Sequence, residues 1–239
     1  MQDSGVKSSF VLGILICVGL ALLGYIGGRS AIKIKEYERT VSVKGLAEAE
    51  YPADVVLWPI QFTAASNELT GIYSQLEEQI KKIEEFLRSN GIDPDEITIS
   101  PPAITDKSAQ QYESAVRAAF RYTAIQTVTV YSKKVEPVRK LINRLSELGK
   151  RGIVITGGDY RASTEYIFTR LNEVKPGMIQ EATKKAREVA ETFAEDSNSE
   201  LGKIKSANQG TFTISDRDKN NPHIKIVRVV STVEYYLAD

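Results

Sequence analysis

The 239-residue sequence contains one cysteine and one histidine, and its positive and negative charges balance. Cys17 lies inside an apolar segment, so the rest of the chain has no thiol for a disulfide or for thiolate chemistry. A histidine-based metal site needs several ligands, and His223 is alone. Lys and Arg number 31, as do Asp and Glu, whereas nucleic-acid binding normally leaves a basic footprint. We therefore expect no metal, no cofactor and no nucleic-acid partner.

Charge is also missing from residues 8–28, which form an apolar run with a core beginning at Phe10. A helix rises about 1.5 Å per residue, so this run matches the roughly 30 Å hydrocarbon layer of a bilayer. Core helices of soluble proteins rarely stay uncharged on every face for so long. The run predicts a single transmembrane helix, with the lipid bilayer as its partner.

A cleaved signal peptide is the main alternative for this segment. Its apolar region is usually about 7–15 residues long and is followed by a small-residue cleavage site. Here the run is longer, and Arg29 and Lys33 interrupt the small residues that follow it. We therefore expect an uncleaved anchor. Gly24 and Gly28 form a G-x-x-x-G pair, which is a weak signal for a helix–helix contact.

The orientation of the anchor depends on the charges that flank it. Arg29, Lys33, Lys35 and Arg39 follow the apolar run, while Lys7 and Asp3 precede it. Basic residues favour the cytoplasmic side of a membrane, so this rule alone predicts a cytoplasmic domain.

The sequence predicts one α+β domain over residues 37–239. Residues 1–36 precede it as an N-terminal tail, the anchor and a linker. The expected order is β-β-α-β-β-α-β-α-β-β, with three main helices on one side of a mixed or antiparallel sheet. Hydrophobic periodicity places strands at 40–49, 55–65, 97–100, 120–132, 207–215 and 224–237, pieces of a further strand at 153–156 and 163–169, and helices at 67–90, at 135–148 and from 175 onward. Asn67 is the expected N-cap of the first helix, and Pro59 predicts a bulge or an edge strand.

No motif in this domain predicts catalysis or metal binding. His223 follows Pro222 and is expected to be a side chain at the edge of a loop without catalytic partners. Residues 216–221 resemble the start of a calcium loop, but Asn221 and Val227 replace the required Gly and Glu, so a solvated hairpin loop is expected. Gly157-Gly158-Asp159 lacks the frame of a phosphate loop and predicts a turn. The pairs Lys133-Lys134 and Lys184-Lys185 are expected to be solvated, and Tyr235 and Tyr236 to face opposite sides of the last strand.

Several segments together resemble one protein family. They are VSVKGLAEAEYPAD at 41–54, SNGID at 89–93, the strand around Tyr122, KPGMIQEATKKAR at 175–187, ELGKI at 200–204 and ANQGTF at 207–212. In this order and spacing they are similar to the SIMPL-domain (DUF541) family. The resemblance covers residues 40–237 and implies a bacterial envelope protein, secreted or anchored, with some members forming rings and some linked to oxidative-stress defence. It implies no catalytic residue, and it predicts that the domain lies in the periplasm, opposite to the charge rule.

We expect a non-enzymatic protein of the inner membrane whose domain forms a homo-oligomer and acts structurally or in stress defence. The last strand, 224–237, is apolar on both faces, and a stripe of alanines at 182, 186, 190 and 194 permits close approach of a partner. One alternative is a periplasmic binding module for a small molecule or an envelope polymer, which a deep pocket would favour. Another is an enzyme that uses two carboxylates, one with a raised pKa.

Overall fold

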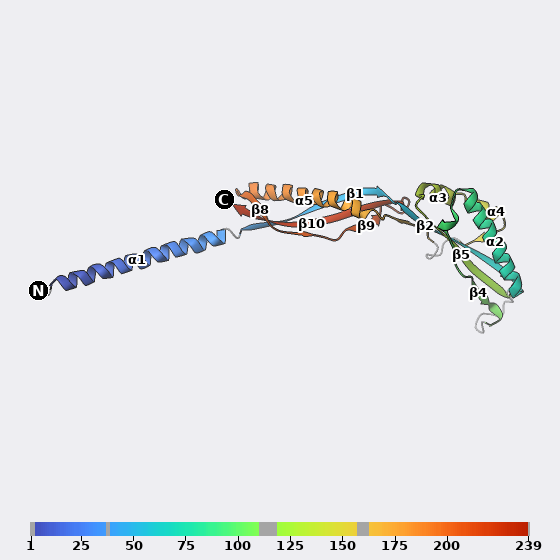
Figure 1. Cartoon of the computed structure of the whole chain (residues 1–239), viewed down its shortest axis with the longest axis horizontal. Helices are drawn as coiled ribbons and strands as arrows, with labels where there is room; N and C mark the ends of the chain where they lie inside the picture. The colour runs from blue at the N-terminus through green and yellow to red at the C-terminus, as the bar shows by residue number, and fades with distance from the viewer. Residues whose placement is uncertain (1–2, 37–38, 110–118, 157–162, 239) are drawn as a thin grey trace. The chain divides into compact units, whose positions relative to one another are not determined.

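The computed structural model describes residues 3–36, 39–109, 119–156 and 163–238, and within residues 3–36 it describes side chains only at 13 and 15–30. The described chain divides into two compact units. Unit 1 contains residues 1–48, 174–213 and 228–239, and unit 2 contains residues 49–173 and 214–227. Figure 1 shows the helices and strands of both units.

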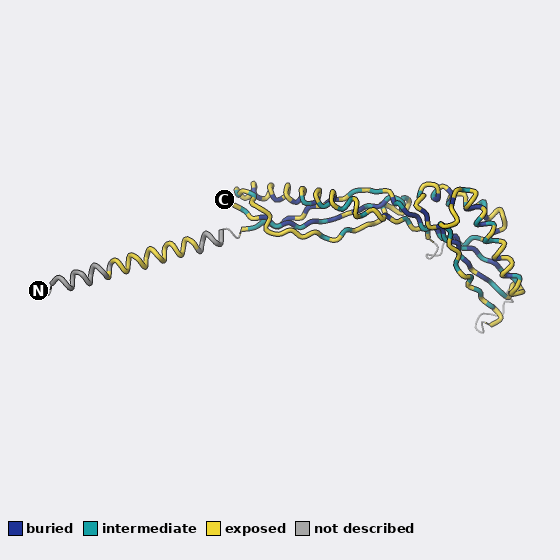
Figure 2. Tube along the Cα trace, viewed as in Figure 1, coloured by how far each residue is buried: buried dark blue, intermediate teal, exposed yellow. Residues whose placement is uncertain are grey.

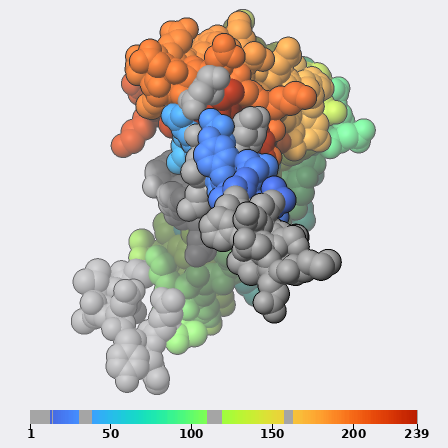
Figure 3. All heavy atoms as spheres, turned by 90° about the vertical axis from the view of Figure 1, so that its left-hand side faces the viewer, coloured from blue at the N-terminus to red at the C-terminus, as the bar shows by residue number. Residues whose placement is uncertain are grey.

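Helix α1, Asp3–Glu36, precedes the first strand. Its described side chains are all exposed, among them Leu20 at 64% and Leu23 at 70% (Figure 2). Figure 3 draws the described atoms of α1 in blue. Among the described residues, no helix combines 18 residues or more with the apolar character that crossing a bilayer requires. The structure therefore does not support the transmembrane helix predicted over residues 8–28.

Unit 1 is built on the strands β1, Thr40–Pro52, β10, Ile224–Ala238, and β8, Glu200–Gln209, in the order β1-β10-β8. The strand β9, Thr213–Asp216, also pairs with β10. β10 and β8 are antiparallel, with Val233 opposite Ala207 and a register shift after Glu234. The predicted strand over 207–215 is thus two strands, β8 and β9, separated at Gly210, where a Cβ atom would lie 2.5 Å from the Val230 carbonyl oxygen.

Helix α5, Leu171–Asp196, packs its alanine stripe on this sheet. Ala186 and Ala190 are fully buried in one cluster with Val43, Val233 and Tyr235. A Cβ atom at Gly45 of β1 would overlap the Ala182 carbonyl oxygen and lie 2.9 Å from the Ala186 Cβ atom. The small residues therefore bring α5 close to its own sheet, and the prediction that the stripe offers a surface to a partner is wrong.

The last strand is buried on one face only. Val227, Val229 and Val233 are buried, whereas the alternate positions include the exposed Arg228 and the half-buried Glu234. Tyr235 is 3% exposed and Tyr236 is 40% exposed, as the opposite-face prediction required. The outward face is mixed, since it also carries the half-buried Ile226 and Val230, so β10 is less uniformly apolar on both faces than predicted.

Unit 2 contains a six-stranded sheet in the order β3-β5-β2-β6, with β4 paired to β5 and β7 to β2. Its centre is the antiparallel pair β2, Val55–Ser66, and β5, Tyr122–Ser132, in continuous register from Val56 opposite Ser132 to Ser66 opposite Tyr122. The short outer strands are β3, Ile97–Ile99, β4, Ala103–Asp106, β6, Val154–Ile155, and β7, Glu165–Ile167. The fold class is thus α+β with antiparallel sheets, but the strands form two sheets rather than the one predicted.

Pro59 lies in β2 without a bulge, so the predicted bulge is wrong, but the edge of β2 away from β5 has no strand partner at this residue. On the edge of β2 away from β5, β7 pairs with residues 55–57 and β6 with Phe62 and Thr63. Pro59 falls in the gap between these two partners. The missing N–H of proline therefore leaves no partner in the ladder unsatisfied.

Three helices cover one face of this sheet, here called the inner face. They are α2, Leu69–Ser89, α3, Val135–Ile142, and α4, Ser146–Lys150. Ile83 of α2, Val138 of α3 and Leu148 of α4 are fully buried in one core with Trp58, Ile60 and Phe62 of β2. The predicted helix over 135–148 is two helices, because the chain turns at residues 143–145.

The helix termini also differ from the predictions. Glu68, not Asn67, is the N-cap of α2, and the Asn67 side chain instead accepts a hydrogen bond from the Arg121 amide at 3.0 Å. α5 begins at Leu171, so Pro176 lies inside the helix rather than at its start. The polar stretch after Pro102 contains β4 and a 3₁₀ turn, Lys107–Ala109, and another 3₁₀ turn, Pro94–Glu96, precedes β3.

Candidate functional site

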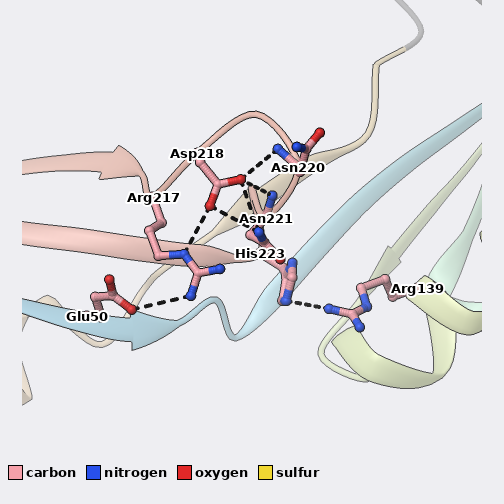
Figure 4. A network of polar contacts seen from close by, with 7 residues as sticks. All are labelled: Glu50, Arg139, Arg217, Asp218, Asn220, Asn221 and His223. Atoms are coloured by element: carbon pink, nitrogen blue, oxygen red, sulfur yellow. Dashed lines mark hydrogen bonds and ion pairs between the residues drawn. The ribbon is translucent and has the colours of Figure 1, made fainter.

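The densest polar network of unit 2 surrounds the turn between β9 and β10 (Figure 4). Asp218 closes this turn: its Oδ1 atom accepts hydrogen bonds from the amides of Asn220 at 2.8 Å and Asn221 at 2.9 Å. Arg217 binds the Asp218 carboxylate at 3.0 Å and reaches Glu50 of β1 at 3.6 Å. These contacts lower the pKa of Asp218 to about 2, with the Arg217 hydrogen bond as the largest cause. The segment that resembled a calcium loop is thus a hairpin turn closed by its own side chains.

His223 lies in the turn directly before β10, at the loop edge that the sequence predicted, and its side chain has structural partners. Its Nε2 atom contacts the Nη1 atom of Arg139 on α3, a residue 84 positions away in the chain. The Tyr166 ring of β7 lies edge-on to the imidazole, with centroids 6.0 Å apart. The His223 carbonyl accepts a hydrogen bond from the Ala53 amide at 2.8 Å. A helix residue and a strand residue therefore contact the imidazole, and Ala53 binds the His223 backbone.

The electrostatics of the cluster favour a neutral imidazole. Burial lowers the pKa of His223 below its ordinary 6.5, and the positive charge of Arg139 lowers it further. Glu136 and Asp218 oppose this shift, and Arg217 adds to it. Burial also raises the pKa of the Tyr166 hydroxyl. A guanidinium can donate only to an imidazole nitrogen that carries no proton, so the observed contact requires Nε2 to be an acceptor.

This geometry limits what His223 can do chemically. The nitrogen that would act as a general base already faces Arg139, and the carboxylate of Glu136 faces Arg139 at 3.6 Å. Within the described residues, no three His, Cys, Asp or Glu side chains gather as a metal site. The arrangement suits a structural contact that breaks when the imidazole gains a proton.

A second cluster holds the bend between β1 and β2. The Asp54 carboxylate accepts hydrogen bonds from the Thr169 amide at 2.7 Å and from its hydroxyl at 2.6 Å, and Arg170 lies 3.6 Å away. Burial alone would raise the pKa of Asp54, but the Thr169 hydrogen bonds and the Arg170 charge outweigh it and lower the pKa. Asp54, between β1 and β2, is thus held by residues 115 and 116 positions further along the chain.

The remaining candidates from the sequence have ordinary surroundings. Lys134 pairs with Asp93 at 2.6 Å, and Lys185 pairs with Glu181 at 2.7 Å. A Cβ atom at Gly24 or Gly28 would meet nothing within 4 Å, so this pair makes no contact with the described chain. Gly157-Gly158-Asp159 lies outside the described residues.

The sequence offered no signal for the partners of His223 and Asp54. Arg139 and Arg170 look like ordinary solvated cations in the sequence, and only the tertiary fold brings them to these groups.

A family model, SIMPL, described as a protein of unknown function (DUF541), matches residues 41–227. No curated protein matches the chain.

Proposed function

Because the chain belongs to the SIMPL (DUF541) family, we propose that it is a non-enzymatic envelope protein anchored in the inner membrane by residues 8–28. In this proposal the two units lie in the periplasm and assemble with copies of themselves, in a structural or stress-defence role. The family match covers both units, since it runs from β1 into β10.

The observation that carries the anchoring proposal is the exposure of α1. Leu15, Leu20, Leu23 and Ile26 are each at least 60% exposed, and no charged residue lies between Lys7 and Arg29. Exposed apolar surface costs about 25 cal/mol per Å², so a helix that is apolar on every side is stable only when something apolar covers it. A bilayer supplies that cover around the whole circumference, which a single protein groove does not.

The non-enzymatic part of the proposal is supported by the state of His223. Histidine is the side chain best suited to proton transfer near neutral pH, and here its Nε2 atom is engaged by Arg139. The carboxylates of the two polar clusters are engaged as well: Asp218 by Arg217 and Asp54 by Thr169. Groups committed to partners in this way serve the fold rather than a substrate.

Two measurements test the proposal. Membranes from cells that express the full chain are washed with alkaline carbonate and then with detergent; an anchored chain stays with the membrane in carbonate and leaves it in detergent. Light scattering on the detergent extract then gives the mass of the assembly. Release by carbonate would contradict the anchor, and a monomeric mass would contradict self-assembly.

A further inference from the structure

The sheet of unit 2 has a second face, opposite the one that the helices cover. Along β2 and β5 the buried residues alternate with residues that point away from the core, and cross-strand pairs share a face. We call this second face the open face. Its described residues are Leu57, Pro59, Gln61, Thr63, Ala65, Thr98, Ala103, Thr105, Thr123, Ile125, Thr127, Thr129, Tyr131, Val154, Glu165 and Ile167.

The open face is accessible and carries apolar side chains. Val154 is 61% exposed, Tyr131 51%, Ile125 45% and Ile167 37%. The helices α2, α3 and α4 all contribute to the core on the inner face. A sheet with one apolar face against helices and a second face of β-branched residues is suited to a further layer.

Charge is nearly absent from the open face. Among its described residues only Glu165 is charged, although 26% of the chain is charged. Threonine is its commonest residue, and threonine offers both a methyl group and a hydroxyl for packing between sheets. In a strand with one solvated face, the residues that point to solvent are normally charged or polar. The composition of the open face therefore indicates a contact surface.

We infer that the open face of unit 2 stacks on the same face of a second copy of this chain. In a two-fold contact the same surface patch of both copies meets, so a cluster of like charges on that patch would face an identical cluster on the partner. A face with a single charge at its rim avoids this repulsion, whereas a partner of opposite charge would have nothing to recognise. The lack of charge therefore favours self-association over capture of a charged ligand or a nucleic acid.

The size of the face fits such a contact. β2 has 12 residues, which at about 3.3 Å per residue gives a length of about 40 Å. Four strand positions, spaced about 4.8 Å apart, give a width of about 19 Å. The product, about 750 Å², is close to the roughly 800 Å² per partner of a standard stable interface. This inference rests on the proposed self-assembly and names the surface that performs it.

The first test places charge on the open face of the full chain in detergent. Ile125→Lys combined with Tyr131→Lys should lower the mass of the assembly at least two-fold, because lysines would then meet across the two-fold axis. Tyr73→Lys on α2 is the matched control, since Tyr73 is 49% exposed on the helical side. It should leave the mass unchanged.

The outcomes separate the two proposals. A monomeric wild-type chain would overturn both self-assembly and the open-face contact. An oligomer that persists in the double variant, at the mass of Tyr73→Lys, would overturn only the open-face contact.

The second test does not depend on how well the double variant folds. Thr127 lies opposite Gln61 in the middle of the β2–β5 ladder, and stacked sheets lie about 10 Å apart. In a Cys17→Ser background, Thr127→Cys treated with a bismaleimide of about that length should give a band of twice the chain mass, and Tyr73→Cys should not. A cross-link only to a chain of different mass would assign the face to another protein and overturn the second copy as occupant.

Discussion

At the scale of single residues, His223 and Asp54 show how distant parts of the chain fix side chains that look unremarkable in sequence. Each is held by groups from another element: His223 by Arg139 and Tyr166, and Asp54 by Thr169 and Arg170. Burial and then the Arg139 charge lower the pKa of His223, and the Thr169 hydrogen bonds and the Arg170 charge lower that of Asp54. Both therefore make stability depend on pH in a predictable direction.

We predict that His223 makes unit 2 less stable in mild acid. Its pKa is depressed in the folded chain, so its contribution is complete above the unfolded value of 6.5 and is lost as the pH falls through the folded pKa. The unfolding midpoint in urea should fall as the pH drops below about 6.5. His223→Gln keeps an acceptor for Arg139 without a titrating group, so it should flatten this dependence.

The same residue allows a direct titration, because His223 is the only histidine of the chain. Its ring proton signal in an NMR titration needs no assignment and should give a midpoint below 6.5. Arg139→Gln removes the nearby positive charge and should move that midpoint upward. A wild-type midpoint at or above 6.5 would show that the imidazole is not held as described.

A second prediction concerns Asp54. Asp54→Ala removes both hydrogen bonds from Thr169 and should destabilise the chain by about 1–3 kcal/mol, the usual cost of losing hydrogen bonds to a charged group. Asp54→Asn keeps the shape and one acceptor and should cost less. Because the folded pKa of Asp54 lies below 3.8, the wild-type advantage over Asp54→Asn should disappear as the pH falls through that folded value. Chemical denaturation at pH 7 and at pH 3 measures both effects; equal stability of all three chains at pH 7 would contradict the prediction.

At the scale of elements, the packing of α5 on its sheet depends on residues without side-chain bulk. The alanine stripe of α5 and Gly45 of β1 face each other, and a Cβ atom at Gly45 would overlap the helix backbone at Ala182. Backbone atoms cannot move aside as a flexible side chain does. The helix would have to shift as a whole.

We therefore predict that Gly45→Ala destabilises the protein by about 1–3 kcal/mol or more, the range for an overpacked core. Gly177→Ala, in α5 itself, is the control: a Cβ atom there meets nothing within 4 Å. It should be neutral or should stabilise the chain by up to about 1 kcal/mol, the difference in helix propensity. Thermal unfolding of both variants beside the wild type checks this, and equal losses in the two would contradict the packing argument.

The elements were also the level at which the sequence was most informative. Alternation and helical periodicity placed β1, β2, β5, β10 and α2 within a few residues, because one face of each is buried in a continuous core. The division into two sheets was not predictable, since it is set by which distant strands pair: β1 with β10, and β2 with β5. The break between α3 and α4 and the tolerance of Pro59 depend equally on tertiary neighbours. The clusters around His223 and Asp54 were missed for the same reason.

At the scale of the whole molecule, two arguments about orientation conflict. Arg29, Lys33, Lys35 and Arg39 follow the apolar run, and basic residues near a span favour the cytoplasmic side. Membership of the SIMPL family instead suggests a domain outside the cytoplasm. The segment before the apolar run is short and carries only Lys7 and Asp3 as side-chain charges. Either side of the membrane can therefore accommodate this segment at little cost.

We predict that residues 37–239 lie outside the cytoplasm. Protease added to intact spheroplasts should then remove the two units, while a cytoplasmic marker protein stays whole. If the charge rule governed orientation instead, the units would be protected until lysis. Replacing Lys33 and Lys35 with Gln removes charge from the disputed side and provides the matched variant. It should leave digestion unchanged or increase it, because fewer basic residues then hold that side in the cytoplasm. Protection of both chains in spheroplasts, with digestion only after lysis, would reverse the orientation and move the proposed assembly into the cytoplasm.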